Sequence, residues 1–506
     1  MKSQKQSRIM TNMGSYALLQ VVTLLVGLVL PRFFLKAYGS EANGVVATVN
    51  SFTTYFSYLE AGLGLALVHA LYRPLAEENT EKTNQILSFS NRQYRKISGV
   101  YFVFVMLLAI VFPIFSDVSC FSKLEFFSLV FVIGLYGALD FYTMAKYRVL
   151  LTADRKEYVI SNAMIFAQLL RFFFSLVLLQ FEISIVFIKL VPVFTLFVRS
   201  VILHTYVKRQ YKSVDFSVVS ISESMNFSHR WDALLLQISI NTSTLLPTII
   251  ISQLLGFKEA NVFSVYSLVI SAVISVISAL SSGVAPDFGR DLAQGKDLNK
   301  KYKVYETLVF YVVAVFFSTA SIMILPFIKM YTNVVSDVNY IYPSLAILSA
   351  VWGAMHSARI PATAVINAAG LYKENRSNNI VNLLLQILLS IVFTFAWGLQ
   401  GMLIAMIVSA LQRNIWYEVI NSKSILKTGL YKRVLKQVFL ILVVGASYSI
   451  YHFFLSNINY TLMLWVLIAA IVFLSALVVC LGFIVVLDFE GLKAVLSLLS
   501  KNKVEK

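Results

Sequence analysis

Two cationic residues interrupt an otherwise apolar stretch, MIFAQLLRFFFSLVLLQFEISIVFIKLVPVFTLF, which runs from Met164 to Phe197. They are Arg171 and Lys189, and the pattern predicts that they lie on neighbouring helices. A cation at the depth of a bilayer is unfavourable by anything from a few to more than about ten kcal/mol, so such residues normally face a hydrated cavity or a partner. Guanidinium and ammonium groups are also the side chains that hold phosphate. Anion binding is therefore the first chemistry that these residues suggest.

Other ionisable residues also lie within apolar segments. Glu60 and Asp140 are acidic, Arg413 is basic, and His356 and Arg359 are close enough in sequence to lie on one face of a helix. Ion pairing is the alternative to ligand binding, because Asp140 or Glu60 could neutralise one of the cations. Cations outnumber acids at depth, however, and this favours an anionic ligand.

Three further basic residues, Lys146, Arg148 and Arg199, lie near the ends of apolar segments. Long basic side chains at such positions commonly extend to the membrane surface. We therefore expect these three residues to extend toward water rather than to face a cavity.

Small polar residues follow one face of two later segments. Residues 261–284 carry serines at helical spacing, namely Ser267, Ser271, Ser275, Ser278 and Ser282, and residues 231–254 carry Asn241 among other polar residues. Close helix packing would explain such a face as well as a cavity wall would. The segments 10–31 and 45–70 are also polar, and packing alone does not predict that symmetry. We therefore include Asn241, Ser271 and Ser275 among the candidate cavity residues.

The sequence contains no pattern typical of a catalytic or metal centre. A Ser/His/Asp arrangement, an HExxH motif and a Walker lysine are all absent from it. Cys120 and Cys480 are the only cysteines, so neither a disulfide framework nor a cysteine metal site is available. We predict no catalytic residues, no metal and no cofactor.

A bundle of membrane-spanning helices must position these residues. The 506 residues are 58% hydrophobic and 13% charged, whereas soluble proteins are about 25% charged. A spanning helix needs roughly 20 mostly apolar residues. Fourteen segments satisfy this condition: 10–31, 45–70, 97–115, 124–145, 158–180, 183–206, 231–254, 261–284, 305–327, 339–362, 378–397, 400–420, 434–455 and 461–486. We expect the first of them to be a span rather than a cleaved signal peptide.

The basic residues also predict the topology. The net charge is +17, and of the 42 Lys and Arg residues 32 fall in segments on the side of the N-terminus, 5 in loops on the other side and 5 within spans. This asymmetry is the positive-inside signal of a multi-pass membrane protein, and it places both termini in the cytoplasm. The positive charge therefore reflects topology, and we predict no nucleic-acid partner.

An internal repeat is visible at one constant offset along the chain. It matches Arg73 with Arg290, Lys156 with Lys373 and Glu157 with Glu374, and the interval in residue number is the same for all three pairs. Repeated halves are typical of transporters. We therefore predict two six-helix lobes in parallel orientation, residues 1–210 and 225–421, followed by two further spans and a cytoplasmic tail in residues 422–506.

Several stretches resemble the MOP exporter superfamily, and most of all its Wzx-type polysaccharide-flippase branch. They are SYALLQVVTLLVGLVLPRFFLKAYGSEANGVV near the N-terminus, LEAGLGLAL followed by PLAEENTEKTNQ, and TAVINAAGLYKENRSNN after the tenth span. The resemblance implies a protein of the bacterial cytoplasmic membrane that moves an undecaprenyl-pyrophosphate-linked oligosaccharide between leaflets by alternating access. It also implies that basic cavity residues hold the pyrophosphate, and that the partners are polysaccharide polymerases and glycosyltransferases.

Three alternatives remain open. A lipid II flippase shares the two additional C-terminal spans. A multidrug antiporter of the same fold would need acidic residues at depth to bind cationic drugs, and here the balance is the opposite. An enzyme such as a polysaccharide polymerase is expected to carry a large outside loop with catalytic Arg or His, and every predicted outside loop is short.

Overall fold

The computed structural model describes residues 2–216, 230–281, 285–426, 431–456, 458–489, 491–493 and 495. Within these ranges all regular secondary structure is helical, which confirms the predicted all-α class. Ten of the helices are long and apolar enough to cross a membrane, so the chain is a multi-pass membrane protein. Ser282, the start of the second predicted lobe at residue 225 and the predicted tail beyond residue 495 lie outside the described residues.

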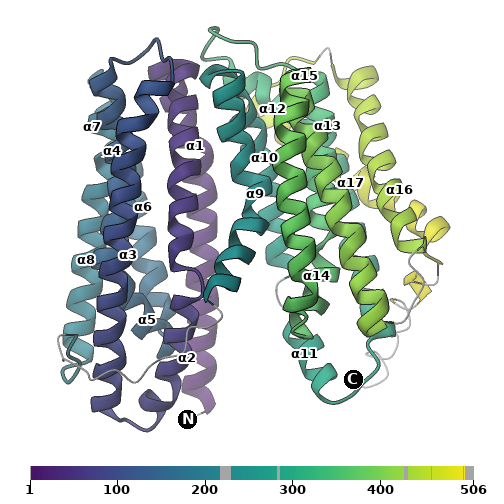
Figure 1. Ribbon diagram of the computed structural model, residues 1–506. Coiled ribbons are helices and arrows are strands. Elements are labelled where there is room, and N and C mark those ends of the chain that lie inside the picture. The colour runs from purple at the N-terminus through teal and green to yellow at the C-terminus, as the bar shows by residue number, and fades with distance from the viewer. Residues whose placement is uncertain are drawn as a thin grey trace. The chain divides into compact units, whose positions relative to one another are not determined.

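The chain forms two compact units, Met1–Asn241 and Thr242–Lys506. The first contains α1 (Lys2–Ser57), a 3₁₀ turn (Tyr58–Glu60), α2 (Leu63–Ala76), α3 (Thr80–Phe115), α4 (Lys123–Thr143), α5 (Ala145–Ala153), α6 (Glu157–Leu179), α7 (Ile185–Ile188), α8 (Val191–Gln210) and the start of α9 (Arg230–Leu254). The second continues with α10 (Phe257–Ser281), α11 (Ala285–Ala293), α12 (Asn299–Thr332), α13 (Pro343–Ala358), α14 (Ile360–Ala368), α15 (Tyr372–Asn421), α16 (Tyr431–Ile450) and α17 (Leu462–Leu487). Figure 1 shows these helices.

These helices are compatible with the fourteen predicted spans. α1 contains two spans, which meet at a break in the helical backbone at Gly39, and α15 contains two that meet at Trp397 and Gly398. In Figure 1, α1 accordingly runs to one end of its unit and returns. The predicted spans 183–206 and 339–362 are each divided between two helices, α7 with α8 and α13 with α14.

The turns between helices recur at the spacing of the sequence repeat. Gly39 and Gly256 both have positive φ, and each lies between the first two spans of a predicted lobe. Glu78 and Gly295 also have positive φ. Both pairs are separated by the same interval in residue number as Arg73 and Arg290. A left-handed backbone conformation is uncommon outside turns. It recurs here at the offset of the predicted repeat, which stays a prediction.

Local sequence explains where two of the long helices begin. Asn79 precedes α3 and its side chain accepts a hydrogen bond from the backbone N–H of Lys82. Ser122 and Glu125 form a capping box at the start of α4, in which each side chain accepts from the other residue's backbone N–H. Such caps satisfy the free N–H groups of the first turn. Behind them, Tyr94, Tyr101 and other buried residues of α3 pack against α4 in the core of the first unit.

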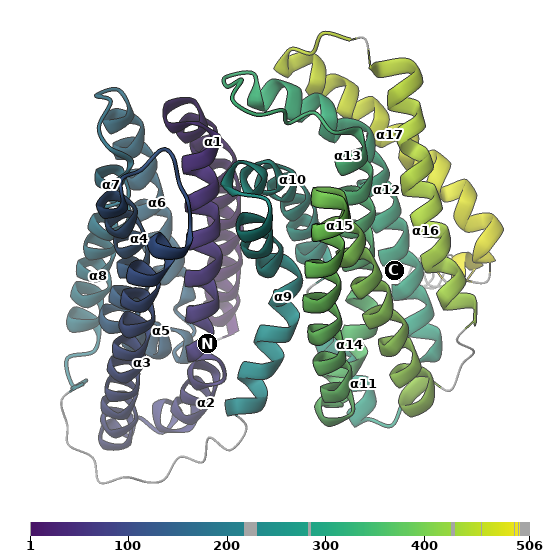
Figure 2. The ribbon, with the colours of Figure 1, turned by 45° about the horizontal axis from the view of Figure 1, so that its top comes forward.

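In the second unit, α12 packs against α10, α13, α16 and α17. Figure 2 shows the two C-terminal helices, α16 and α17, beside α12. Charged groups join them at one end: Nζ of Lys436 lies 2.8 Å from Oε2 of Glu306 and 2.7 Å from Oδ2 of Asp488. Arg433 adds a contact of 3.0 Å to Glu418. The C-terminal spans are thus attached to the unit by buried ion pairs as well as by apolar packing.

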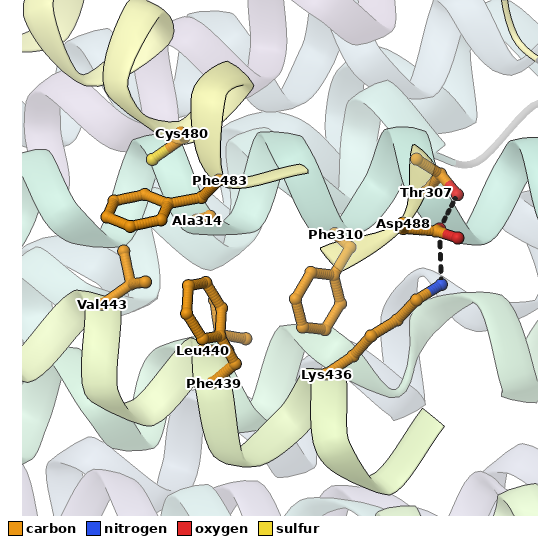
Figure 3. Close-up of a pocket in the computed structure, with 10 residues that line it drawn as sticks. All are labelled: Thr307, Phe310, Ala314, Lys436, Phe439, Leu440, Val443, Cys480, Phe483 and Asp488. Atoms are coloured by element: carbon orange, nitrogen blue, oxygen red, sulfur yellow. Dashed lines mark hydrogen bonds and ion pairs between the residues drawn. The ribbon is translucent and has the colours of Figure 1, made fainter. Parts of the chain in front are cut away.

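A small pocket of about 30 Å³ lies beside this network, between α12, α16 and α17. Figure 3 shows that Lys436, Asp488 and Thr307 meet at one end of it, where Thr307 donates a 2.6 Å hydrogen bond to Asp488. The remainder of the lining is almost entirely apolar and includes Phe310, Phe439, Leu440, Val443 and Phe483. We therefore regard this pocket as part of the packing of the C-terminal helices.

Candidate functional site

A cavity of about 330 Å³ lies within the first unit. This volume is at the lower end of the range of about 300–1,000 Å³ that is usual for small-molecule sites. Both arms of α1, together with α3, α4, α6, α7 and the start of α8, contribute to its wall. The lining residues are Leu30, Phe34, Asn50, Thr53, Thr54, Ser57, Tyr101, Val132, Ile133, Tyr136, Gly137, Asp140, Phe141, Arg171, Ser175, Ile188, Lys189 and Pro192.

Arg171 and Lys189 both line this cavity. Arg171 is on α6, and Lys189 directly follows α7. The Lys189 Nζ lies 4.0 Å from the centroid of the Phe34 ring, a cation–π contact. Each cation is in the electrostatic field of the other. The structure therefore brings the two residues to one polar space, as their positions on neighbouring helices suggested.

A break in the helix explains the position of Lys189. α7 ends at Ile188, and α8 begins at Val191 with Pro192 in its first turn. Proline has no N–H group and fits the first turn of a helix, where that group would lack an intrahelical partner. Lys189 therefore lies at a junction between helices instead of on the outer surface of a continuous span.

The acidic residues near this cavity are engaged by other cations. Asp140 lies 3.0 Å from Nη1 of Arg148 and also forms a close ion pair with Arg199. Arg148 is in addition 3.7 Å from Oε2 of Glu60, whose other carboxylate oxygen accepts a 2.7 Å hydrogen bond from Tyr94. Glu60 ends the 3₁₀ turn between α1 and α2 and does not line the cavity. The carboxylates are therefore part of a structural network.

The prediction that Arg148 and Arg199 extend to the membrane surface is wrong. Arg199 is only 6% exposed, and its Nε contacts the sulfur of Met144 at 2.9 Å in addition to the ion pair with Asp140. Arg148 lies on α5, which directly follows α4. Its side chain points toward Asp140. Burial of Asp140 without a partner would be strongly unfavourable, and the two arginines neutralise it.

The pairing of the acids leaves Arg171 and Lys189 without a carboxylate partner in the part of the chain that the structure describes. The sequence left open whether Asp140 or Glu60 neutralises Arg171 or Lys189. In the structure both acids pair with other arginines. The cavity therefore combines two cations, one carboxylate that is already neutralised, and neutral polar groups.

Neutral polar groups of the wall come from the second arm of α1 and from two tyrosines. Asn50, Thr53 and Ser57 lie on one face of α1 and line the cavity, as the polar pattern of residues 45–70 indicated. Tyr101 of α3 donates a 3.2 Å hydrogen bond to the carbonyl oxygen of Thr53. Tyr136 of α4 lies near Arg171. Neither tyrosine could be predicted from the sequence, since no spacing signal separates them from the many other tyrosines of the chain.

The polar residues predicted on the seventh and eighth spans do not line this cavity. The Asn241 amide donates a 2.8 Å hydrogen bond to the carbonyl oxygen of Gln237 on its own helix. Ser275 similarly donates to the carbonyl oxygen of Ser271 at 2.8 Å on α10. Their role as cavity residues stays a prediction.

The remaining predicted site residues meet in the second unit. His356 is near the end of α13, Arg359 lies between α13 and α14, and Arg413 is on the second arm of α15. Nη2 of Arg359 is 2.9 Å from Nε2 of His356, and both residues are electrostatic neighbours of Arg413. His356 and Arg413 are 5% and 2% exposed. This group, His356 with Arg359 and Arg413, is called the buried cation cluster below.

No protein-family model matches this sequence, and no curated protein is similar to it. Solved structures are similar in fold. One is "Lipid II flippase MurJ, inward closed conformation", with 12% identity, a TM-score of 0.65, and coverage of 94% of this chain and 98% of that chain. Another is the inward-facing conformation of a multidrug resistance MATE family transporter of the MOP superfamily, with 13% identity, a TM-score of 0.65, and coverage of 80% and 96%.

The MATE multidrug transporter DinF-BH is a third similar structure, with 17% identity, a TM-score of 0.56, and coverage of 82% of this chain and 94% of that chain. At these identities the similarity concerns the arrangement of helices and not the ligand. The chain therefore has the fold shared by the MurJ flippase and the MATE transporters.

Proposed function

We propose that this protein flips an undecaprenyl-pyrophosphate-linked oligosaccharide across the bacterial cytoplasmic membrane by alternating access, with both termini in the cytoplasm. The observation that carries the proposal is the pair of cations in the cavity of the first unit. Arg171 and Lys189 line it together, and among the described residues neither has a carboxylate partner. The pyrophosphate of such a substrate provides the counter-charge for these two cations.

The volume of the cavity matches the phosphate-bearing headgroup of the substrate better than the whole substrate. About 330 Å³ suffices for a phosphate-bearing group with part of a sugar. Asn50, Thr53, Ser57 and Tyr136 add amide and hydroxyl groups of the kind that bind sugar hydroxyls. The lipid chain would remain in the bilayer, and glycosyltransferases and a polymerase would act before and after the transport step.

The pairing of the acids argues against a multidrug antiporter. A cationic drug needs a free carboxylate, and Asp140 is already held by Arg148 and Arg199. The pairing of the acids does not distinguish the proposed substrate from lipid II, because lipid II also carries a pyrophosphate. Coverage of 94% of this chain by the MurJ structure keeps lipid II as the second candidate.

The test is export of surface polysaccharide in a cell that lacks its own flippase. The wild-type chain is expected to restore export, and Arg171→Gln combined with Lys189→Gln to reduce it at least about tenfold, since each charged hydrogen bond contributes about 1.5–3 kcal/mol. Lys123→Gln is the matched control, because Lys123 is an exposed cation at the start of α4. Membrane insertion of each variant is checked by immunoblot.

Full export by a correctly inserted double variant would contradict the role of these cations. Rescue of growth in a cell depleted of its lipid II flippase, without polysaccharide export, would instead identify lipid II as the substrate. Drug resistance without either form of rescue would favour the antiporter.

A further inference from the structure

The buried cation cluster of the second unit contains positive charge without an acidic neighbour. Arg359 donates from Nε to the carbonyl oxygen of His356 at 3.1 Å, and it also interacts with Tyr417. The charged or titratable neighbours of Arg413 are Arg359, His356 and Tyr417. Within the described residues no carboxylate belongs to this cluster. Two guanidinium groups beside each other in a buried site repel one another, and they require a counter-charge.

Several N–H groups of the cluster have no hydrogen-bond partner. Nε and Nη2 of Arg413 are buried, and neither finds an acceptor among the described residues. Nδ1 of His356 and Nε1 of Trp352 are also buried without a partner, and the rings of these two residues have centroids 5.3 Å apart. Most buried polar atoms in proteins are satisfied, and an unsatisfied charged donor is particularly unfavourable. Unused donors around a positive charge are the expected features of an anion site.

The first unit solves the equivalent problem with a carboxylate. There, Asp140 of α4 pairs with the buried Arg199 of α8. The offset of the sequence repeat places Ser357 of α13 at the position of Asp140. In the second unit, α13 packs against α15, which carries Arg413. A buried arginine is present on the last helix of each predicted lobe. The same offset places Trp416 opposite Arg199, and Arg413 lies about one helical turn earlier on α15, whereas the acid on the fourth helix is replaced by serine.

We infer that the buried cation cluster binds one small inorganic anion of the chloride class, which supplies the negative charge that Asp140 supplies in the first unit. A lipid headgroup does not fit this role, because the unpaired donor atoms of Arg413 and His356 are each sealed from solvent and Arg413 is 2% exposed. The inference goes beyond the proposed transport function, which depends on Arg171 and Lys189 in the other unit.

Trp352 provides an intrinsic probe of this site. Iodide quenches tryptophan fluorescence, and a bound iodide beside His356 would quench Trp352 saturably, whereas the other tryptophans would show only a linear response. The experiment is an iodide titration of the purified full-length protein at constant ionic strength, with gluconate as the balancing anion. We expect a saturable component that chloride competes away and that Trp352→Phe removes.

Arg413→Gln is expected to weaken the saturable component about tenfold or more, because it removes a charged donor. Lys123→Gln is the matched control, because it removes an exposed cation from the other unit, and iodide affinity should not change. Ser357→Asp should abolish iodide binding by placing a carboxylate at the position of Asp140, whereas Ser357→Asn should not.

Absence of a saturable component in the wild-type protein would overturn the inference, as would an unchanged iodide affinity in Arg413→Gln or in Ser357→Asp. If Arg413→Gln does not fold, anomalous diffraction from wild-type crystals soaked in bromide decides the question. A bromide peak beside Arg413 supports the site, and bromide peaks only elsewhere, or none, refute it. None of these results depends on transport, so they remain distinct from the export assay.

Discussion

Asp140 of α4 and Arg199 of α8 form an ion pair inside the first unit, and Arg148 of α5 contacts the same carboxylate at 3.0 Å. Three helices of the unit are thus tied at one acidic residue beside the cavity. Removal of one partner from a buried ion pair typically reduces stability by about 3–5 kcal/mol, because a charge is left buried without compensation.

We therefore predict that Asp140→Asn lowers the free energy of unfolding by about 3 kcal/mol or more. The measurement is thermal or chemical unfolding of the purified protein in detergent. Asp140→Asn combined with Arg199→Gln should recover part of the loss, since it removes the uncompensated charge. If the single variant is as stable as the wild type, the network does not hold these helices together.

A second prediction concerns the charge of the cavity itself. Ser175 lies one helical turn after Arg171 on α6, and both residues line the cavity. A carboxylate at this spacing can pair with the guanidinium group. Ser175→Asp should therefore reduce polysaccharide export about tenfold or more while Arg171 is still present, and Ser175→Asn should have a much smaller effect. Equal export by the two variants would show that the anion does not bind at Arg171.

Two glycines of α1 should respond differently to substitution by alanine. Gly39 has a φ of 77° and a ψ of −178°, a region essentially restricted to glycine, in which another residue is unfavourable by about 1–3 kcal/mol. Gly27 is within a regular helical segment, and a Cβ added there would meet no heavy atom within 4 Å. Gly39→Ala should thus lower the unfolding free energy by about 1–3 kcal/mol, whereas Gly27→Ala should leave it unchanged or raise it by up to about 1 kcal/mol. Unfolding midpoints of the two variants test this contrast.

The attachment of the C-terminal helices should depend on pH through Asp488. Burial alone would raise the pKa of this carboxyl, but hydrogen bonds from Lys436, Thr307 and the backbone N–H of Gly491 outweigh it and lower the pKa below the ordinary 3.8. A depressed folded-state pKa stabilises the protein at pH values above the ordinary pKa, and this contribution is lost as the pH falls through the lowered value.

The difference in unfolding free energy between the wild type and Asp488→Asn should therefore be constant from neutral pH down to about pH 4, at about 1–3 kcal/mol, and should shrink at lower pH. Unfolding of both proteins as a function of pH measures it. A difference that is already lost between pH 7 and pH 5 would show that Asp488 is not stabilised in this way.

Cys120 offers a test of the predicted topology. It is exposed in the segment between α3 and α4, whereas Cys480, the second cysteine, is buried. Burial of the thiol itself and the nearby Glu41 carboxylate raise the pKa of Cys120 to about 12. The thiolate is the reactive form, so labelling by a maleimide at pH 8 should be at least an order of magnitude slower than that of a free cysteine.

On intact cells, a membrane-impermeant maleimide should nevertheless label Cys120, because the positive-inside pattern places this segment outside. Glu41→Gln should accelerate the labelling. Labelling of Cys120 only after the cells are opened would reverse the predicted orientation.

Much of the fold follows from the sequence because membrane spans are defined by composition. An apolar run of sufficient length forms a helix in lipid regardless of its partners, since every backbone polar group must be satisfied within the segment. The predicted all-α class therefore agrees with the structure, and the predicted span 158–180 corresponds to α6, Glu157–Leu179. Turns such as those at Gly39 and Gly256 depend on local backbone conformation, and they recur at the offset of the predicted repeat.

The partners of the charged residues could not be predicted in this way. Distance from the end of a span suggested that Arg199 reaches the surface, yet the side chain is buried against Asp140, because the packing of α4 against α8 decides which faces meet. The break before Pro192 likewise places Lys189 in the cavity. The sequence by itself determined that charges lie at membrane depth. Only the tertiary structure decided which of them are neutralised, since that depends on the rotation and register of helices far apart in the chain.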